Sequence, residues 1–284
     1  MPQRVAVIIP AHNAASTLPQ QLEALAAQRD APPFEVVVVD NRSTDNTAGV
    51  AKSWGAGVVS APRRRGAPHA RNEGVRETDH DLVLHCDADD IVNETWVADL
   101  VASLRVHDLV GGSTSLARVN DGAVAASITS PAVLGLPVCM GRTYVLAGNM
   151  GYRRGVWVDI GGFDESLDSG HEEVDFTWRA AASGAAVGFV PSAIVYYRQR
   201  VDLRSIARQR FNYGRSFAQL YSKHQHEDIP RVSAKMEARK IAMHLLGARH
   251  LVRHGDRRRP WLMHSAWVAG RIAGDLKFRV RAPG

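Results

Sequence analysis

Cysteine is scarce in this chain, because only Cys86 and Cys139 occur among its 284 residues. The two lie far apart along the sequence, so they form neither a CxxC metal-binding pair nor a disulfide framework. We therefore expect two buried thiols in a reducing compartment.

Long apolar runs are also missing. No uninterrupted apolar segment is long enough to span a bilayer, and the apolar run near the N-terminus ends at Pro10 without the features of a signal peptide. We expect a cytoplasmic protein, with weak peripheral association at the inner membrane face as a secondary expectation. The length suits one large domain, or one domain with a modest extension.

The charge of the chain is unbalanced, with a formal net charge of +6. Such a charge suits an acidic partner such as nucleic acid, an anionic lipid or a phosphorylated substrate. Neither a helix-turn-helix pattern nor an aromatic RNA-binding signature accompanies the basic residues, so we expect no nucleic-acid partner. An apolar content of 45% and a charged content of 23% are typical of a globular protein and argue against a disordered chain.

The first hundred residues alternate between apolar strands and helical patterns. The spacing predicts strands at 5–9, 36–39, 58–59 and 82–84, and helices at 18–26, 48–54, 70–76 and 94–104. Because the strands are continuously apolar, they indicate a parallel sheet covered on both faces. Ligands of such sheets bind beyond the carboxyl ends of the strands.

The remainder of the chain has a different pattern. From 111 to about 150 the periodicity is poor, which predicts irregular structure or short antiparallel strands. A helix at 175–183 and strands at 187–190 and 194–197 follow, and helical patterns rich in arginine and histidine begin near 203. We expect one domain over 1–202, with a change of pattern near 110, and a helical C-terminal extension over 203–284.

Acidic residues follow the strand at 82–84. Asp87, Asp89 and Asp90 lie within four residues, and a divalent cation would relieve their mutual repulsion. A helix-capping loop would explain Asp90 but not the other two, so we favour a site for Mg²⁺ or Mn²⁺ that also grips a diphosphate.

Three other segments carry polar residues suited to a site. Asp40 ends a strand and could accept hydrogen bonds from a base or ribose, although a helix-capping turn is the simpler explanation. Glu172 and Glu173 lie at the start of the predicted helix region, where acids interact favourably with the helix dipole, but either could act as a general base. The basic stretch 63–71 precedes a helix and could neutralise phosphate, or could be a solvated loop.

Together these segments resemble the inverting glycosyltransferases of family 2, which have the GT-A fold. The matching motifs occur in family order over roughly residues 4–200, and they occupy 7–13, 37–45, 66–74, 87–90, 148–149, 161–165 and 172–179. The resemblance implies a nucleoside-diphosphate sugar donor, an acceptor hydroxyl of unknown identity, a divalent metal and inversion at the anomeric carbon.

The resemblance also implies residue roles. Nucleotide-sugar contacts fall on Pro10, Ala11, Asn13, Asp40, Arg71 and Asp87. Metal binding falls on Asp87 and Asp89. The catalytic base falls on Glu173, with Glu172 as the alternative. Two departures stand out, because Glu173 occupies a position where the family usually has Asp, and Tyr197-Arg198 occurs where many relatives have a metal-binding histidine.

Other classes of function fit less well. A dinucleotide-binding oxidoreductase would need a glycine motif that opens a helix, whereas Gly55-Ala56-Gly57 precedes a strand and lacks the last glycine. A nucleotidyltransferase also needs metal-binding carboxylates and remains the alternative enzyme. A non-enzymatic basic module that binds nucleic acid or membrane is the third alternative.

The membrane alternative rests on the C-terminal residues. Its apolar members are Trp261, Leu262, Trp267, Val268 and Ile272, and its basic members are Arg271, Lys277, Arg279 and Arg281. Tryptophan and arginine on one helix suit the surface of an anionic membrane. A helix packed within the protein explains the same residues, and we favour that explanation.

Overall fold

A computed structural model describes residues 3–120, 132–200, 202–227 and 258–283, together with the isolated positions 229, 239, 242 and 243. The chain divides into two compact units. The sheet unit comprises Met1–Cys139, Thr143–Asp168 and Glu172–Gln199, and the helical unit comprises Met140–Arg142, Ser169–His171 and Arg200–Gly284.

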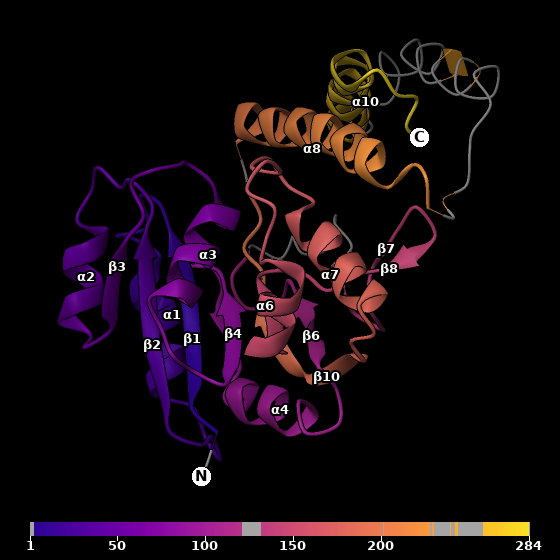
Figure 1. Cartoon of the computed structure of the whole chain (residues 1–284). Coiled ribbons are helices and arrows are strands. Elements are labelled where there is room, and N and C mark those ends of the chain that lie inside the picture. The colour runs from indigo at the N-terminus through magenta and orange to yellow at the C-terminus, as the bar shows by residue number, and fades with distance from the viewer. Residues whose placement is uncertain are drawn as a thin grey trace. The chain divides into compact units, whose positions relative to one another are not determined.

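An eight-stranded sheet forms the centre of the sheet unit, in the order β3-β2-β1-β4-β9-β6-β10-β5 (Figure 1). Its strands are β1 Val5–Ala11, β2 Phe34–Asp40, β3 Gly57–Ser60, β4 Leu82–Cys86, β5 Ile91–Val92, β6 Leu109–Ser115, β9 Asn149–Arg153 and β10 Val187–Tyr196. A separate pair is formed by β7 Val138–Cys139 and β8 Arg142–Thr143. The strands β3, β2, β1 and β4 run parallel, so their carboxyl ends lie at one edge of the sheet.

Helices cover both faces of this sheet. Those of the sheet unit are α1 Leu18–Ala26, α2 Thr47–Ser53, α3 Ala67–Arg76, α4 Trp96–Ser103, α6 Arg154–Ile160 and α7 Glu172–Ala182. Alternate residues of β1 enter different cores: Val7 packs with side chains of α1, α2 and α4, whereas Ile8 packs with side chains of α3, α6 and α7. The period of two along a buried strand thus explains why β1 is apolar throughout.

The middle of the sheet includes a short antiparallel strand, one of the two outcomes predicted for 111 to about 150. Most of β6 and the first two residues of β9 lie in that segment, and β9 pairs antiparallel with both β4 and β6. Gly112 is required because a Cβ there would lie 2.2 Å from the carbonyl oxygen of Ala193. Asn149 is fully buried, and its amide donates to the carbonyl oxygens of Ser113 and Ala193. Tertiary contacts, rather than apolar alternation, therefore select the small and polar residues of these strands.

The packing of α3 on the sheet yields a stability prediction. A Cβ at Gly74 would lie 2.5 Å from Ile8 Cγ2 and 2.8 Å from Val39 Cγ2. Although alanine is the better helix former, we expect Gly74→Ala to lower the free energy of unfolding by about 1–3 kcal/mol, as overpacking does. Gly155 of α6 has no atom near its would-be Cβ. In urea unfolding, Gly155→Ala should be neutral or stabilising; equal effects of the two substitutions would contradict this account.

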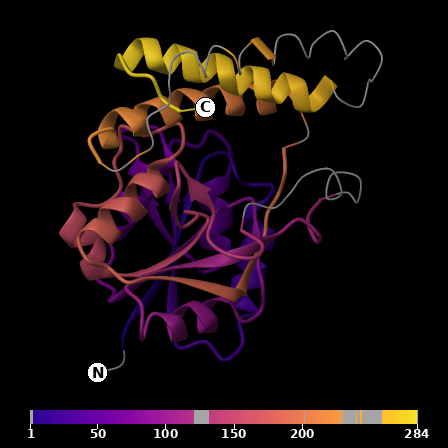
Figure 2. The same ribbon diagram turned by 90° about the vertical axis from the view of Figure 1, so that its right-hand side faces the viewer.

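Two helices make up most of the described part of the helical unit: α8 Leu203–His224 and α10 Arg258–Phe278 (Figure 2). They cross closely, because a Cβ at Gly214 would lie 2.0 Å from the carbonyl oxygen of Trp267 and one at Gly270 would lie 1.9 Å from that of Phe211. The helical pattern that we expected through 241–246 lies largely outside the described residues. Within the described ranges, no helix combines the length and apolar character needed to cross a bilayer.

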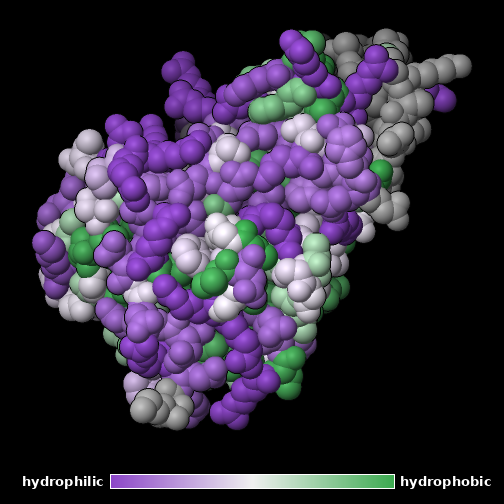
Figure 3. Space-filling view, in the orientation of Figure 1, coloured by the Kyte–Doolittle hydropathy of each residue, from purple (hydrophilic) through white to green (hydrophobic). Residues whose placement is uncertain are grey.

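Arg271 and Trp267, two of the residues behind the membrane alternative, take part in this packing, whereas Leu262 and Ile272 are exposed. Arg271 is 4% exposed and donates to the Asp275 carboxylate and to the carbonyl oxygen of Ala282. Trp267 packs edge-on against Phe217. On the face drawn in Figure 3, apolar residues are scattered among hydrophilic ones. These contacts support the explanation of α10 as a packed helix.

Candidate active site

The turns after β1 and β2 are joined by hydrogen bonds. The amide nitrogen of Asn13 donates to Ser43 Oγ at 3.0 Å, and the amide nitrogen of Thr44 donates to Asn13 Oδ1 at 2.7 Å. Asn13 has a φ of 52°, a left-handed conformation that asparagine tolerates better than most residues. Asp40 Oδ1 accepts from the amide nitrogen of Ser43, so this carboxylate both shapes its turn and stands at the edge where a nucleotide would bind.

The acidic turn after β4, residues 87–90, is fixed by hydrogen bonds from neighbouring segments. Gln21 of α1 is fully buried and donates to the carbonyl oxygen of Asp87. Arg198 donates through Nε to the carbonyl oxygen of Asp89, and its own amide nitrogen donates to Asp90 Oδ1. The backbone of the turn is thus fixed while Asp89 is exposed at the surface and Asp87 is half-buried.

Asp90 differs from the other two acids. It is 2% exposed, and burial together with the charges of Asp87 and Asp89 raises its pKa well above the usual range. A buried carboxyl that favours its neutral form is a poor cation ligand. Asp90 instead has a structural role, because its carboxyl oxygen accepts the hydrogen bond from the amide nitrogen of Arg198 in the segment that follows β10.

A buried arginine joins the acidic turn to the start of α7. Arg71 of α3 is 3% exposed, and it donates to Asp87 Oδ1 through one terminal nitrogen and to Glu172 Oε1 through the other, each at 2.8 Å. Its guanidinium carbon lies 5.8 Å from the centre of the Phe163 ring. Burial opposes the charge of Arg71, but Asp87 and Glu172 outweigh burial and raise its pKa. The guanidinium therefore stays charged and holds two candidate site residues together.

Glu173 is the acid beside this bridge. It lies in the first turn of α7, and its backbone carbonyl accepts from Thr177. Burial raises the pKa of Glu173 well above its usual value, and the negative charge of Glu172 raises it further. A carboxylate with a raised pKa is a better proton acceptor than a solvated one, which suits a general base.

The acidic turn offers oxygen ligands of the kind that Mg²⁺ and Mn²⁺ prefer. A Cβ at Gly148 would lie 2.5 Å from Asp87 Oδ2, so only glycine leaves space around that carboxylate. Within the described residues, no group of three or more His, Cys, Asp or Glu side chains is arranged to hold a metal. Two carboxylates fit a cation that takes its other ligands from phosphate and water, as Mg²⁺ commonly does.

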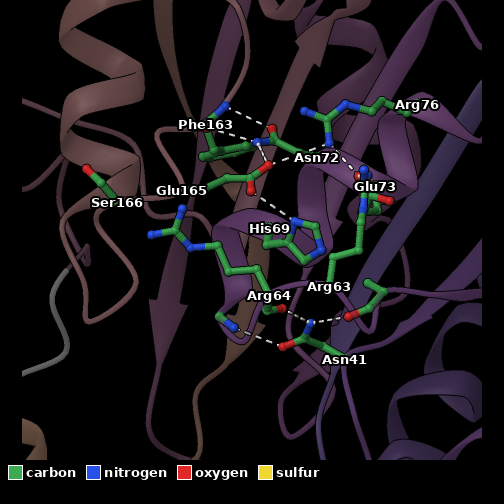
Figure 4. A network of polar contacts seen from close by, with 12 residues as sticks. Asn41, Arg63, Arg64, His69, Asn72, Glu73, Arg76, Phe163, Glu165 and Ser166 are labelled. Carbon is green, nitrogen blue, oxygen red and sulfur yellow. Dashed lines mark hydrogen bonds and ion pairs between the residues drawn. The ribbon is translucent and has the colours of Figure 1, made fainter.

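A second polar network supports the outer side of α3 (Figure 4). Asn72 is 1% exposed, donates to the carbonyl oxygen of Phe163 and to Glu165 Oε1, and accepts from the amide nitrogen of Phe163. His69 bonds through Nδ1 to Glu165 Oε2 at 2.9 Å. These bonds fix the loop before α7 against α3, on the helix that carries Arg71.

The structure brings the predicted site residues to one edge of the sheet unit. They end or follow β1, end β2, follow β4, or lie on α3 and α7: Pro10, Ala11, Asn13, Asp40, Arg71, Asp87, Asp89, Glu172 and Glu173. Hydrogen bonds between side chains join Arg71 to both Asp87 and Glu172. Sequence reasoning missed Gln21, whose signal was a glutamine on the otherwise apolar face of a helix. It also missed the role of Asn72.

Comparisons with solved structures show the fold of the chain. The mannosyltransferase PcManGT from Pyrobaculum calidifontis, solved with GDP-Man and Mn²⁺, matches 98% of this chain and 76% of its own at 21% identity and a TM-score of 0.59. TarS 1-349 of S. aureus, solved with UDP-GlcNAc, matches 97% of this chain and 91% of its own at 19% identity and a TM-score of 0.58. The protein thus has the GT-A fold that the motifs predicted, with helices after the sheet.

The sequence comparisons match part of the chain to a family. Residues 6–135 match the model of the family described as Glycosyl transferase family 2. A pre-mycofactocin glycosyltransferase of Mycobacterium tuberculosis is 31% identical over 247 residues, which cover 80% of this chain and 50% of the relative. Residues 6–135 thus match glycosyl transferase family 2, and this match confirms the resemblance seen in the motifs. It spans about half the length of this curated relative.

Proposed function

We propose that this protein transfers a sugar from a nucleoside-diphosphate sugar to an acceptor hydroxyl, with inversion at the anomeric carbon and with a divalent metal. The observation that carries the proposal is the bridge of Arg71 between Asp87 and Glu172. It ties the turn suited to a diphosphate to the helix that carries a candidate base. Relatives named as glycosyltransferases and the family match support the same conclusion.

We assign the roles of the residues from the resemblance to the family, together with their place at this edge of the sheet. Pro10, Ala11, Asn13 and Asp40 line the nucleotide. Asp87 and Asp89 would hold Mn²⁺ or Mg²⁺, and a bound cation would offset the negative charge of the diphosphate. Glu173 accepts the proton of the acceptor hydroxyl as that oxygen bonds to the anomeric carbon. The bond between that carbon and the diphosphate breaks on the opposite face, so the product has inverted configuration and a nucleoside diphosphate leaves.

Arg71 and Glu172 act as positioning residues in this scheme. Arg71 holds the carboxylates of Asp87 and Glu172 by direct charge pairing, and the charge of Glu172 raises the pKa of Glu173. A thermal-shift screen of UDP- and GDP-sugars with Mn²⁺ tests the first requirement of this proposal, which is that the protein binds a donor. A ligand that binds only the folded state raises the melting temperature. No shift with any donor would contradict the proposal.

Replacement of the exposed Asp89 distinguishes a loss of metal binding from a loss of the fold. We expect Asp89→Ala to abolish metal-dependent donor binding while the melting temperature without ligand stays unchanged. The fold should survive because Arg198 bonds to the backbone of Asp89, which alanine retains. Calorimetry with donor and Mn²⁺ measures the effect, and Asp159→Ala, an exposed acid on α6, is the matched control. Donor affinity equal in both variants would remove Asp89 from the site.

A further inference from the structure

We propose that a cavity on α3, separate from the donor site, binds a phosphoryl anion. The cavity has a volume of about 470 Å³ and is lined by Arg63, Arg64, His69, Arg76 and Glu165. That volume lies within the usual range for pockets that bind small molecules. The proposal stands on the described residues of the sheet unit and does not depend on the proposed transferase activity.

The cavity and the donor site lie on different faces of the same helix. His69 and Arg76 share a face because they are seven residues apart, about two helical turns. Arg71 is two residues from His69, so its side chain leaves the helix on nearly the opposite side and reaches Asp87. An anion in the cavity would therefore be bound by residues that the donor site does not use.

The charges around the cavity leave one cation unmatched. Arg63 and Arg76 both pair with Glu73, and Arg76 also lies 3.5 Å from Glu165. The guanidinium of Arg64 has no hydrogen bond or ion pair to the described residues, and this residue is exposed. Arginine presents a planar fork of donors that matches the oxygens of a phosphoryl group.

A buried histidine supplies a second, independent observation. The side chain of His69 is 3% exposed, and its Nε2 has no hydrogen-bond partner in the described part of the chain. A buried polar atom without a partner is costly, so native proteins rarely leave one unexplained. Figure 4 shows Nδ1 turned toward Glu165 and the opposite edge of the ring turned away from it.

The partner of Nδ1 indicates what Nε2 can do. Burial raises the pKa of Glu165, but bonds from Asn72 and His69 outweigh burial and lower it, so Glu165 is ionised and accepts the Nδ1 proton. Nδ1 is thus occupied, and Nε2 is the ring nitrogen left to bond to a phosphoryl group. Arg64 and His69 line one cavity, and a phosphoryl group has enough oxygens to bond to the unmatched guanidinium and to the unpartnered nitrogen together.

Calorimetry with inorganic phosphate, without donor or metal, tests the proposal. We expect binding that Arg64→Ala weakens about tenfold or more, the scale of one charged hydrogen bond. Arg105→Ala, an exposed arginine after α4, is the matched control and should bind as the wild type does. The ring nitrogen signals of His69, identified with His69→Gln, should shift when phosphate is added.

Two further experiments identify the source of the phosphoryl group and distinguish the cavity on α3 from the donor site. Glycerol phosphate and vesicles with phosphatidic acid distinguish a soluble phosphomonoester from a lipid headgroup, and binding of either supports the cavity. Asp89→Ala should bind phosphate normally, which separates this proposal from the transferase proposal. No phosphate binding, or binding that Arg64→Ala leaves unchanged and a nucleoside diphosphate displaces, would overturn the proposal.

Discussion

Replacement of Glu173 by glutamine should lower turnover by about 10²–10⁴-fold, the usual contribution of a general base. Glutamine keeps the size and hydrogen-bonding capacity of glutamate but cannot accept the acceptor's proton. Donor affinity should hardly change, because Glu173 is not among the residues proposed to hold the nucleotide or the metal. Single-turnover rates with saturating donor, alongside calorimetric donor affinity, separate the two effects.

The matched control is Glu172→Gln. Glu172 Oε1 accepts a hydrogen bond from a terminal nitrogen of Arg71 at 2.8 Å. We therefore expect a smaller loss of turnover, about tenfold or less, because only one hydrogen bond is altered. A large loss in Glu172→Gln with normal turnover in Glu173→Gln would move the base by one residue.

The pH dependence provides a second readout for Glu173. Because its pKa in the folded protein is raised, activity should be lost on acidification at a pH above the ordinary glutamate value of 4.5. Glu172→Gln removes a neighbouring negative charge and should move that acid limb to lower pH. A merely structural role for Glu172 would leave the limb in place.

The same raised pKa has a consequence for stability. A folded carboxyl with a raised pKa binds protons more tightly than the unfolded one, so its destabilising effect grows as pH rises from about 4.5 through the folded pKa. Glu173→Gln removes that cost. We therefore expect the variant to be more stable than the wild type at neutral pH, with a difference that shrinks on acidification.

Replacement of Arg71 by methionine should have the largest effect on the fold. The guanidinium is 3% exposed and lies between Asp87 and Glu172, whose side chains are 32% and 9% exposed. Without it, Glu172 is left as a buried charge with no partner in that bridge. We expect the free energy of unfolding to fall by about 3–5 kcal/mol, the range for breaking one side of a buried ion pair.

Two variants make the Arg71 experiment specific. Arg105→Met removes an exposed arginine and should leave stability unchanged. Adding Glu172→Gln to Arg71→Met removes the buried charge that lost its partner, so the double variant should recover part of the lost stability in urea unfolding. A double variant less stable than Arg71→Met alone would contradict the bridge.

The strands and turns of the nucleotide-binding edge could be predicted because each signal is local. Val36 to Val39 form a continuous apolar run, and Asp40 begins a turn rich in Asn, Ser and Thr within the next few residues. β1 and β4 are also largely apolar, and polar residues follow each of them, with three acids within 87–90 after β4. Their carboxyl ends meet at one edge because parallel strands require it, so the sequence placed the candidate residues together without tertiary information.

The rest depends on contacts between distant segments. β6 contains Gly111 and Gly112 and looks like a loop, but Gly112 lies against the carbonyl oxygen of Ala193, far along the chain. Arg71 reaches partners 16 and 101 residues away, so its role as a bridge has no local signal. Gln21 and Asn72 are buried for the same reason, since their amides bind backbone atoms of other segments.

The nature of the product tests the central claim most directly. Donor sugars of UDP and GDP should be incubated with the protein and Mn²⁺, and the released phosphate species should be identified. We expect a nucleoside diphosphate from the wild type and none above background from Asp89→Ala, because glycosyl transfer breaks the bond between the sugar and the diphosphate. Release of pyrophosphate from a nucleoside triphosphate and a sugar phosphate, with no nucleoside diphosphate from any donor sugar, would instead make the protein a nucleotidyltransferase.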